Sequence, residues 1–373
     1  MAAERFRETG KGSFFGDLVY DRVVPQNHFL RKLNEVMDWR PFTKKLVRYY
    51  KGGAEYGPPP YEPVLLLKML LLSYLYDLSE RQTEDLVSYH LLAKWFVGLA
   101  VDEAAPDHAS LTVFKNRLLA RRGEQVFAAL FQDIIRLAQE RGVRFGRIQV
   151  VDSVHTVADV NVEQDEGRQH GGQGPRDGDA AWGAKGKKQR WDERGQPQMQ
   201  REYFFGYKAH VSMNAEVGII TSLTFTPGNA YDGHQLPALV AQDLAQGIGA
   251  QVYAGDRGYD DGENHAFLAA RGLKSALRLN AYRTQKKNGN KAPWLRLVAD
   301  PDYQAGLRER PKVERPFGEA KVCHGFRRCR YVGLVRYAVQ GYLTAMVLNL
   351  KRLVKLWCGV RFRNQPQAVP RAA

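Results

Sequence analysis

The chain has 373 residues, 44% of them hydrophobic and 25% charged, with a formal net charge of +15. This length suggests two or three domains with ample buried cores. The positive charge and a pI of about 9.6 predict a polyanionic partner, although many basic proteins bind no nucleic acid. The apolar run from Val64 to Tyr76 is only thirteen residues long and contains Lys68, which predicts a core helix and excludes a membrane span.

The number and spacing of the cysteines indicate the cellular compartment of the protein. The chain has three of them, Cys323, Cys329 and Cys358, and they have neither zinc-site spacing nor an even count. We therefore expect a protein of the reducing cytoplasm, associated with the nucleoid if its polyanionic partner is DNA.

Residues 1–144 predict a helical domain. Ser79 is suited to cap a helix, and Gln82 stands three residues later as in a capping box. This helix and the apolar helix before it meet at a short turn, with Arg81 and Lys94 expected to be exposed. The pair is either a DNA-reading helix-turn-helix or ordinary helix packing.

Residues 145–335 predict a second domain that begins with strands. Arg147 to Val151 is an apolar, β-branched run that carries Asp152 directly after it. Two further strands, Tyr203 to Met213 and Val217 to Phe225, are joined by a short turn and predict a hairpin. Asp232 then resembles a helix N-cap.

The strands continue with a short run, Val252 to Ala254, which is followed by Asp256 in a tight exit. A helix over Glu263 to Ala270 and a strand over Lys274 to Leu279 come next. Three antiparallel strands followed by alternating helices and strands predict a mixed α/β sheet of the ribonuclease-H type. Such a sheet can bring Asp152 and Asp256 together, and residues 336–373 are left as a C-terminal helix and tail.

Residues 163–200 interrupt this pattern after its first strand. They are rich in Gly, Gln and charged residues and nearly free of aliphatic ones, so they predict a flexible insertion. Trp182 and Trp191 lie there among basic residues and could stack on single-stranded or flipped bases.

Glu314 lies in a strongly basic segment. Arg310 is four residues before it and Lys321 seven residues after it, so a helix would place all three on roughly one face. Pro316 is tolerated only if it falls in the first helical turn, so the helix is expected to begin near Lys312. A basic cluster follows at Arg327, Arg328, Arg330 and Arg336.

Several of these motifs together resemble the DDE transposases of bacterial insertion sequences, and in particular the insertion-sequence-five family. The motifs are VVDSVHT, FFGYKAH, TPGNAYDGHQL, GDRGYDD and the R-x3-E-x6-K pattern of Arg310, Glu314 and Lys321. The similarity extends from about residue 15 to residue 350. One departure is Leu307, where the family pattern often has a tyrosine, which puts a phosphate or base contact in doubt.

The resemblance implies a DNA transposase that cleaves and joins strands at the inverted repeats of its own element. It implies that Asp152, Asp256 and Glu314 are catalytic and hold two Mg²⁺ or Mn²⁺ ions. Synapsis of two ends implies at least a homodimer on double-stranded DNA, away from any membrane. The implied DNA-binding residues are Arg310, Lys321, Arg327, Arg328, Arg330, Lys208 and His210.

Two alternatives remain on the same fold. One is a DNA-binding regulator without catalysis, against which the intact Asp152, Asp256, Glu314 and Lys321 argue. The other is a metal-dependent nuclease that lacks strand transfer. Other acidic residues could replace members of the triad: Glu319, Glu309, Asp260, Asp261 and Asp159.

Overall fold

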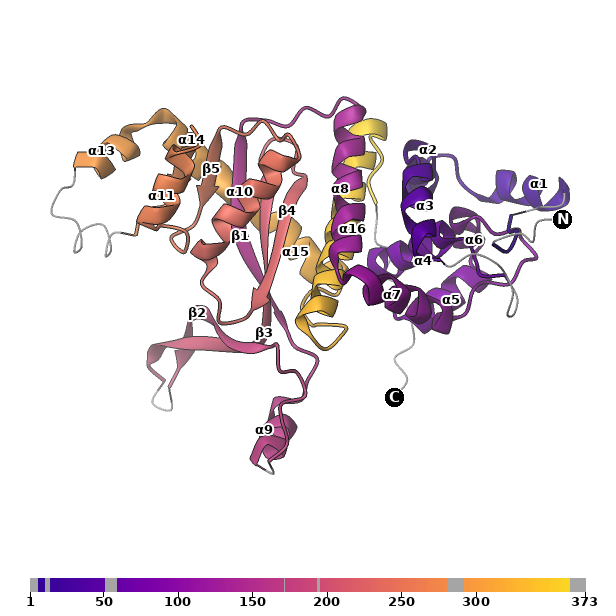
Figure 1. Ribbon diagram of the computed structural model, residues 1–373, viewed down its shortest axis with the longest axis horizontal. Coiled ribbons are helices and arrows are strands. Elements are labelled where there is room, and N and C mark those ends of the chain that lie inside the picture. Colours follow the sequence, from indigo (N-terminus) through magenta and orange to yellow (C-terminus); the bar gives the residue numbers. More distant parts are fainter. Residues whose placement is uncertain are drawn as a thin grey trace. The chain divides into compact units, whose positions relative to one another are not determined.

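The computed structural model describes residues 6–10, 14–50, 59–170, 172–192, 195–280 and 292–362 (Figure 1). The chain divides into two compact units. Unit 1 consists of Met1–Ile134 and Met346–Ala373, and unit 2 consists of Ile135–Ala345. Within the described ranges, no helix is both long and apolar enough to cross a membrane.

Unit 1 is helical, as expected. Its elements are α1 (Phe14–Val23), α2 (Phe29–Val36), α3 (Arg40–Leu46), η1 (Val47–Tyr49), α4 (Pro63–Leu75), α5 (Glu80–Tyr89), α6 (Leu91–Val97) and α7 (His108–Arg122). Two helices contribute residues to both units: α8 (Gln125–Glu140) and α16 (Leu334–Cys358). Every residue of α4 is buried, so this helix forms the centre of the unit 1 core.

The predicted cap of α5 is confirmed, since Ser79 and Gln82 form both bonds of a capping box. Arg81 is exposed, whereas the expectation of an exposed Lys94 is wrong. The Lys94 ammonium is buried and donates to the carbonyl oxygens of Val101 at 3.0 Å and Glu103 at 2.8 Å. Lys94 therefore connects α6 to the loop that follows it and does not face solvent.

Unit 2 is built on one mixed sheet. Its strands are β1 (Ile148–Val157), β2 (Ala181–Trp191), β3 (Pro197–Asn214), β4 (Ile220–Pro227), β5 (Val252–Gly255) and β6 (Lys274–Leu277). Antiparallel pairing joins β1 to β3 and β3 to β4, while β1, β5 and β6 run parallel. Apart from β2, this order and direction are those of the ribonuclease-H-like fold that the sequence predicts.

Helices cover both faces of this sheet. On one side, α10 (Leu236–Ala245) packs on β3 and β4, and its Asp243 accepts a bond from Tyr253 of β5 at 3.2 Å. On the other side, α14 (Pro301–Glu309) packs on β1, β5 and β6, with Gly306 against Ala276 of β6 and Ala254 of β5. Tyr253 and Ala254 are adjacent and point to opposite faces, as the alternation of a strand requires.

The remaining elements of unit 2 are η2 (Asp232–Gln235), α11 (Gly262–Ala269), α13 (Ala292–Ala299), η3 (Arg310–Val313), α15 (Glu314–Cys323) and α9 (Val162–His170). The last of these, with β2 and the beginning of β3, falls in the segment 163–200, where we expected a flexible insertion. The segment thus contains a helix and a paired ribbon (Figure 1).

Candidate active site

Asp152 lies within β1, beyond the point where its parallel neighbour ends. The β1–β5 pairing stops at Val150 opposite Ala254, whereas β1 continues to Val157. The flank of β1 beside Asp152 is therefore not covered by β5. The Asp152 side chain shares a face with Val150 and points toward the side of the sheet that α14 covers.

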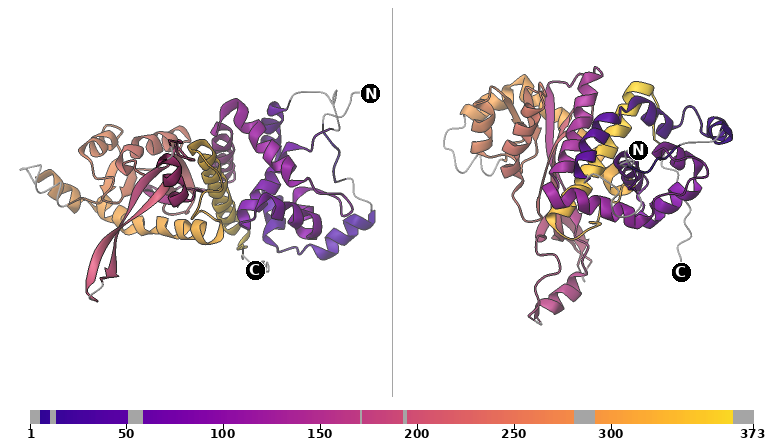
Figure 2. Two further views of the ribbon diagram at one scale, coloured as in Figure 1. Left: turned by 90° about the horizontal axis from the view of Figure 1, so that it is seen from below. Right: turned by 45° about the vertical axis from the view of Figure 1, so that its right-hand side comes forward.

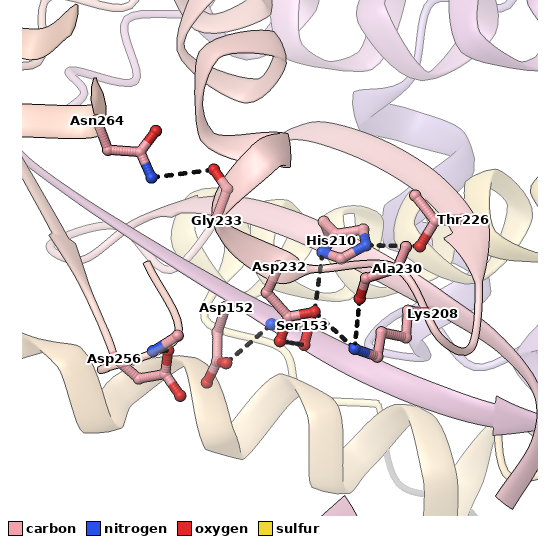
Figure 3. A network of polar contacts seen from close by, with 11 residues as sticks. Asp152, Ser153, Lys208, His210, Thr226, Ala230, Asp232, Gly233, Asp256 and Asn264 are labelled. Atoms are coloured by element: carbon pink, nitrogen blue, oxygen red, sulfur yellow. Dashed lines mark hydrogen bonds and ion pairs between the residues drawn. The ribbon is translucent and has the colours of Figure 1, made fainter. Parts of the chain in front are cut away.

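Asp256 follows β5 directly and is held by its own loop. Its Oδ1 atom accepts a hydrogen bond from the backbone amide of Gly258 at 2.8 Å. Because β1 and β5 are parallel neighbours, Asp256 comes close to Asp152, as Figure 3 shows. The structure thus brings the two aspartates close together where β5 ends, and their catalytic role stays a prediction.

Glu314 begins α15, and a guanidinium group joins it to Asp152. Arg310 donates from one terminal nitrogen to Asp152 Oδ2 at 3.0 Å and from the other to Glu314 Oε1 at 2.8 Å. The bond to Asp152 connects residues 158 positions apart in the chain, and the bond to Glu314 connects residues four positions apart. Pro316 falls in the first turn of α15, as expected from its missing amide.

The closeness of the aspartates affects the pKa values of the groups around them. Burial raises the pKa of Asp152 to about 6; Arg310 and the Ser153 amide oppose this shift, and Asp256 and Asp232 reinforce it. The completely buried Tyr259 also senses three carboxylates. After burial itself, Asp232, Asp152 and Asp256 are the groups that raise the pKa of its hydroxyl.

The three carboxylates of the site are ligands that a divalent cation prefers, but they are not arranged as they would be around a bound ion. Among the described residues, no three acidic, histidine or cysteine side chains form a group that could hold a metal ion. Glu314 is 62% exposed and directed to Arg310, and Arg310 also holds the second oxygen of Asp152. The guanidinium thus supplies the positive charge between two of the three carboxylates.

Asp232 is a site residue that the sequence prediction missed. We expected it to cap a helix, but Tyr231 stands at the N-cap of η2 and neither η2 nor α10 has a side-chain cap. Asp232 instead accepts hydrogen bonds from Ser153 Oγ at 2.9 Å and Lys208 Nζ at 2.8 Å (Figure 3). It therefore links β1 and β3 on the sheet face opposite Asp152.

Two residues that were expected to contact DNA have hydrogen-bond partners within the protein instead. His210 is completely buried, its Nε2 lies 2.9 Å from Thr226 Oγ1, and the expectation that it contacts DNA is wrong. Lys208 is 15% exposed and donates to Asp232 and to the Ala230 carbonyl oxygen at 2.9 Å. Strand alternation places both residues on the face that η2 and its preceding loop cover, which the sequence alone does not reveal.

The other basic candidates remain closer to solvent. Arg327 and Arg328 are exposed, and Arg328 pairs with Asp159 at 2.9 Å. Arg330 is partly buried. Lys321 Nζ lies 3.5 Å from His155 Nε2, and burial, Lys185 and Arg327 lower the pKa of Lys321. Like charges thus gather near the end of α15.

The alternative acidic residues have contacts away from Asp152. Asp261 caps α11, Asp260 accepts from the Asn280 amide at 2.6 Å, and Glu309 pairs with Lys312. Glu319 lies on α15, 3.8 Å from His324. The structure thus brings Asp152 and Asp256 together, connects Glu314 through Arg310, and gives the alternatives other partners.

Comparisons with known proteins agree with this fold. Residues 18–117 match the family model described as "Transposase domain (DUF772)", and residues 155–350 match the one described as "Transposase DDE domain". The second match alone covers more than half of the chain. Neither match tests the assignment to the insertion-sequence-five branch, which stays a prediction.

Solved structures show a weaker likeness. The Mos1 transposase paired-end complex with left transposon end is 12% identical, with a TM-score of 0.20 over 74% of this chain and 83% of that one. The Mos1 mariner paired-end complex with Mn is 14% identical, with a TM-score of 0.20 over 85% and 92%. The sequence matches establish the family without these structures: the chain belongs to the DDE transposases, the polynucleotidyl transferases that move DNA segments.

Proposed function

We propose that this transposase binds the terminal inverted repeats of its own insertion sequence and cleaves and transfers strands at Asp152, Asp256 and Glu314. The observation that carries the assignment is the Arg310 bridge. It connects the carboxylate of β1 to that of α15, beside an aspartate that raises the pKa of Asp152. A carboxylate whose pKa is shifted by burial and by specific charged neighbours, as that of Asp152 is, is typical of catalytic centres.

The chemistry of the donor set fits a hard divalent cation. Three carboxylates offer the oxygen ligands that Mg²⁺ and Mn²⁺ prefer, and a cation there would stabilise the ionised form of Asp152. We propose two such ions as the cofactor. When bound, they would act as Lewis acids on the phosphate and lower the pKa of the attacking water or 3′-hydroxyl.

The residues of the chain orient this site. The Ser153 amide fixes Asp152 Oδ1 at 2.8 Å, and the Gly258 amide fixes Asp256 Oδ1. Asp152 and Glu314 can serve as metal ligands only after their ion pairs with Arg310 break. The Arg310 guanidinium is then available to bind a DNA phosphate. Lys321 and the exposed Arg327 and Arg328 are proposed to contact the flanking backbone, and two copies of the chain to hold two element ends.

The triad is tested by isosteric replacement. We expect Asp152→Asn, Asp256→Asn and Glu314→Gln each to abolish Mg²⁺-dependent cleavage of an end substrate, because each removes a ligand charge while preserving shape. Binding to the same DNA should change less than threefold. Strand transfer measured in the same reaction separates a transposase from a simple nuclease.

Two matched controls make the test specific. Glu319→Gln changes the same residue type in the same helix, and Asp159→Asn removes an aspartate that is 45% exposed. Both should retain cleavage within a few-fold of the parent. If Glu319→Gln is inactive and Glu314→Gln active, the third ligand has been assigned to the wrong glutamate.

A further inference from the structure

The β2–β3 ribbon extends beyond the sheet as an arm of two strands. Pairing of β3 with β1 begins at Gly206 and with β4 at Tyr207, whereas its pairing with β2 reaches outward to Trp191 opposite Pro197. Residues 197–205 of β3 therefore pair only with β2. Figure 2 shows this ribbon extending away from the rest of unit 2.

One face of this arm carries exposed aromatic and apolar side chains on either side of an exposed arginine. Alternation along β3 places Met199, Arg201, Tyr203 and Phe205 on the same face, and their register adds Trp182 opposite Phe205 and Trp191 opposite Pro197. The exposed fractions of these side chains are 52% for Trp182, 70% for Trp191, 60% for Met199 and 57% for Tyr203. An isolated two-stranded hairpin is marginally stable in water, so a partner that covers this face would also stabilise the arm.

The opposite face of the arm is polar and basic. Lys188 pairs with Gln200 and Arg190 with Gln198, and both cations lie near Glu202 at 3.9 and 3.5 Å. Residues 181–206 contain six Lys or Arg and three Asp or Glu. A second copy of the same arm would carry the same excess of positive charge, which disfavours self-association and favours an anionic partner.

The root of the arm adds to this positive charge. Lys185 occupies the bulge between Ala184 and Gly186. The pKa of His155 is lowered to about 4, first by burial and then by Lys321, Lys185 and Lys208. Cations from β2 and α15 therefore act together on His155 where the arm joins the sheet.

We propose that the β2–β3 arm binds duplex DNA by entering a groove, with the Trp191–Met199–Tyr203 face against sugars and base edges and Lys188 and Arg190 toward phosphates. The major groove is about 12 Å wide and admits a two-stranded ribbon. This inference rests on the proposed function, because it gives the element-end DNA a second contact beside the cleavage site. The arm would hold duplex beyond the scissile bond.

The test measures DNA binding by the full chain without divalent metal, so that cleavage does not interfere. Trp191→Ala/Tyr203→Ala should weaken affinity for end duplex at least tenfold with little change in the salt dependence. Lys188→Ala/Arg190→Ala should reduce the slope of log affinity against log salt by up to about two. The control Leu295→Ala alters another apolar side chain, 67% exposed on α13, and should bind within twofold of the parent.

A second measurement identifies the partner even if a variant folds poorly. The photo-reactive residue p-benzoylphenylalanine at position 191 should cross-link to the DNA strand of the complex. Cross-linking to another copy of the chain, or unchanged affinity in Trp191→Ala/Tyr203→Ala, overturns the proposal. The active-site assignment is judged separately: if Asp152→Asn still cleaves while the arm variants lose binding, the arm stands and the triad fails.

Discussion

Asp152 and Ser153 are adjacent in β1, and each is held by a side chain that is distant in sequence: Asp152 by Arg310 and Ser153 by Asp232. Arg310 and Glu314 are four residues apart, across the junction of η3 and α15, so their ion pair is a local contact that this spacing allows. The bond from Arg310 to Asp152 depends on the tertiary fold. The sequence around Asp232 is typical of a helix N-cap, but its side chain instead accepts hydrogen bonds from Ser153 of β1 and Lys208 of β3.

Asp232 is predicted to maintain the site from the opposite face of β1. Asp232→Ala removes the acceptor of two donors, and we expect the free energy of unfolding to fall by about 1–3 kcal/mol. Because Ser153 adjoins Asp152, cleavage should fall more than DNA binding. Thermal unfolding and the two assays check this, with Asp159→Asn as the surface control. Unchanged stability and cleavage would show that the network contributes nothing.

Lys68 makes unit 1 sensitive to pH. Burial lowers its pKa from 10.5 to about 8, although Lys68 donates to Asn34 at 2.9 Å and lies over the ring of Trp39. Between pH 8 and 10.5 the unfolded chain binds more protons at this residue than the folded chain. This group therefore makes stability rise with pH in that window.

Lys68→Met should remove this pH dependence and stabilise unit 1 near neutral pH. At 1.36 kcal/mol per pKa unit the shift corresponds to roughly 3 kcal/mol, from which the lost contacts with Asn34 and Trp39 subtract. Urea unfolding of the parent and variant at pH 7 and pH 9.5 measures both effects. An identical pH slope in the two proteins would contradict the prediction.

At the scale of elements, most of the sheet was predictable. β1, β3, β4, β5 and β6 are apolar or alternating runs bounded by turns, so their signal is local. β2 was not predicted, since lysine, arginine, glutamine and glycine interrupt its two tryptophans and two alanines, and it is stabilised by pairing with β3. The composition of residues 163–200 therefore indicates that the segment has no buried core of its own. It does not indicate whether the segment forms helices or strands.

The packing of α10 on the sheet depends on one buried acid. Asp243 accepts hydrogen bonds from Ser212 Oγ at 2.6 Å, Gln149 Nε2 at 3.1 Å and Tyr253. Asp243→Ala leaves these buried donors without their acceptor, and we expect a loss of at least about 3 kcal/mol in the free energy of unfolding. Calorimetry measures it. Gln242→Ala, in the same helix, is the comparison, and an equal loss there would argue against a special role for Asp243.

At the scale of the whole molecule, the two chain ends contribute to one compact unit. Val347 and Leu350 of α16 line the same apolar cavity of unit 1 as Leu30 and Leu33 of α2. A fragment that ends at residue 144 would lack these side chains. The domain boundaries 1–144, 145–335 and 336–373 remain a prediction from composition, which cannot detect that a C-terminal helix returns to an N-terminal core.

All residues of the proposed metal centre lie in unit 2. With Fe²⁺ in place of Mg²⁺, ascorbate and peroxide generate hydroxyl radicals that cut the backbone near a bound ion. We expect cuts of the full chain, in complex with end DNA, close to residues 152, 256 and 314. They should disappear in Asp152→Asn/Asp256→Asn, and excess Mg²⁺ should suppress them. Cuts elsewhere, or cuts that persist in that variant, would contradict the assignment of the active site.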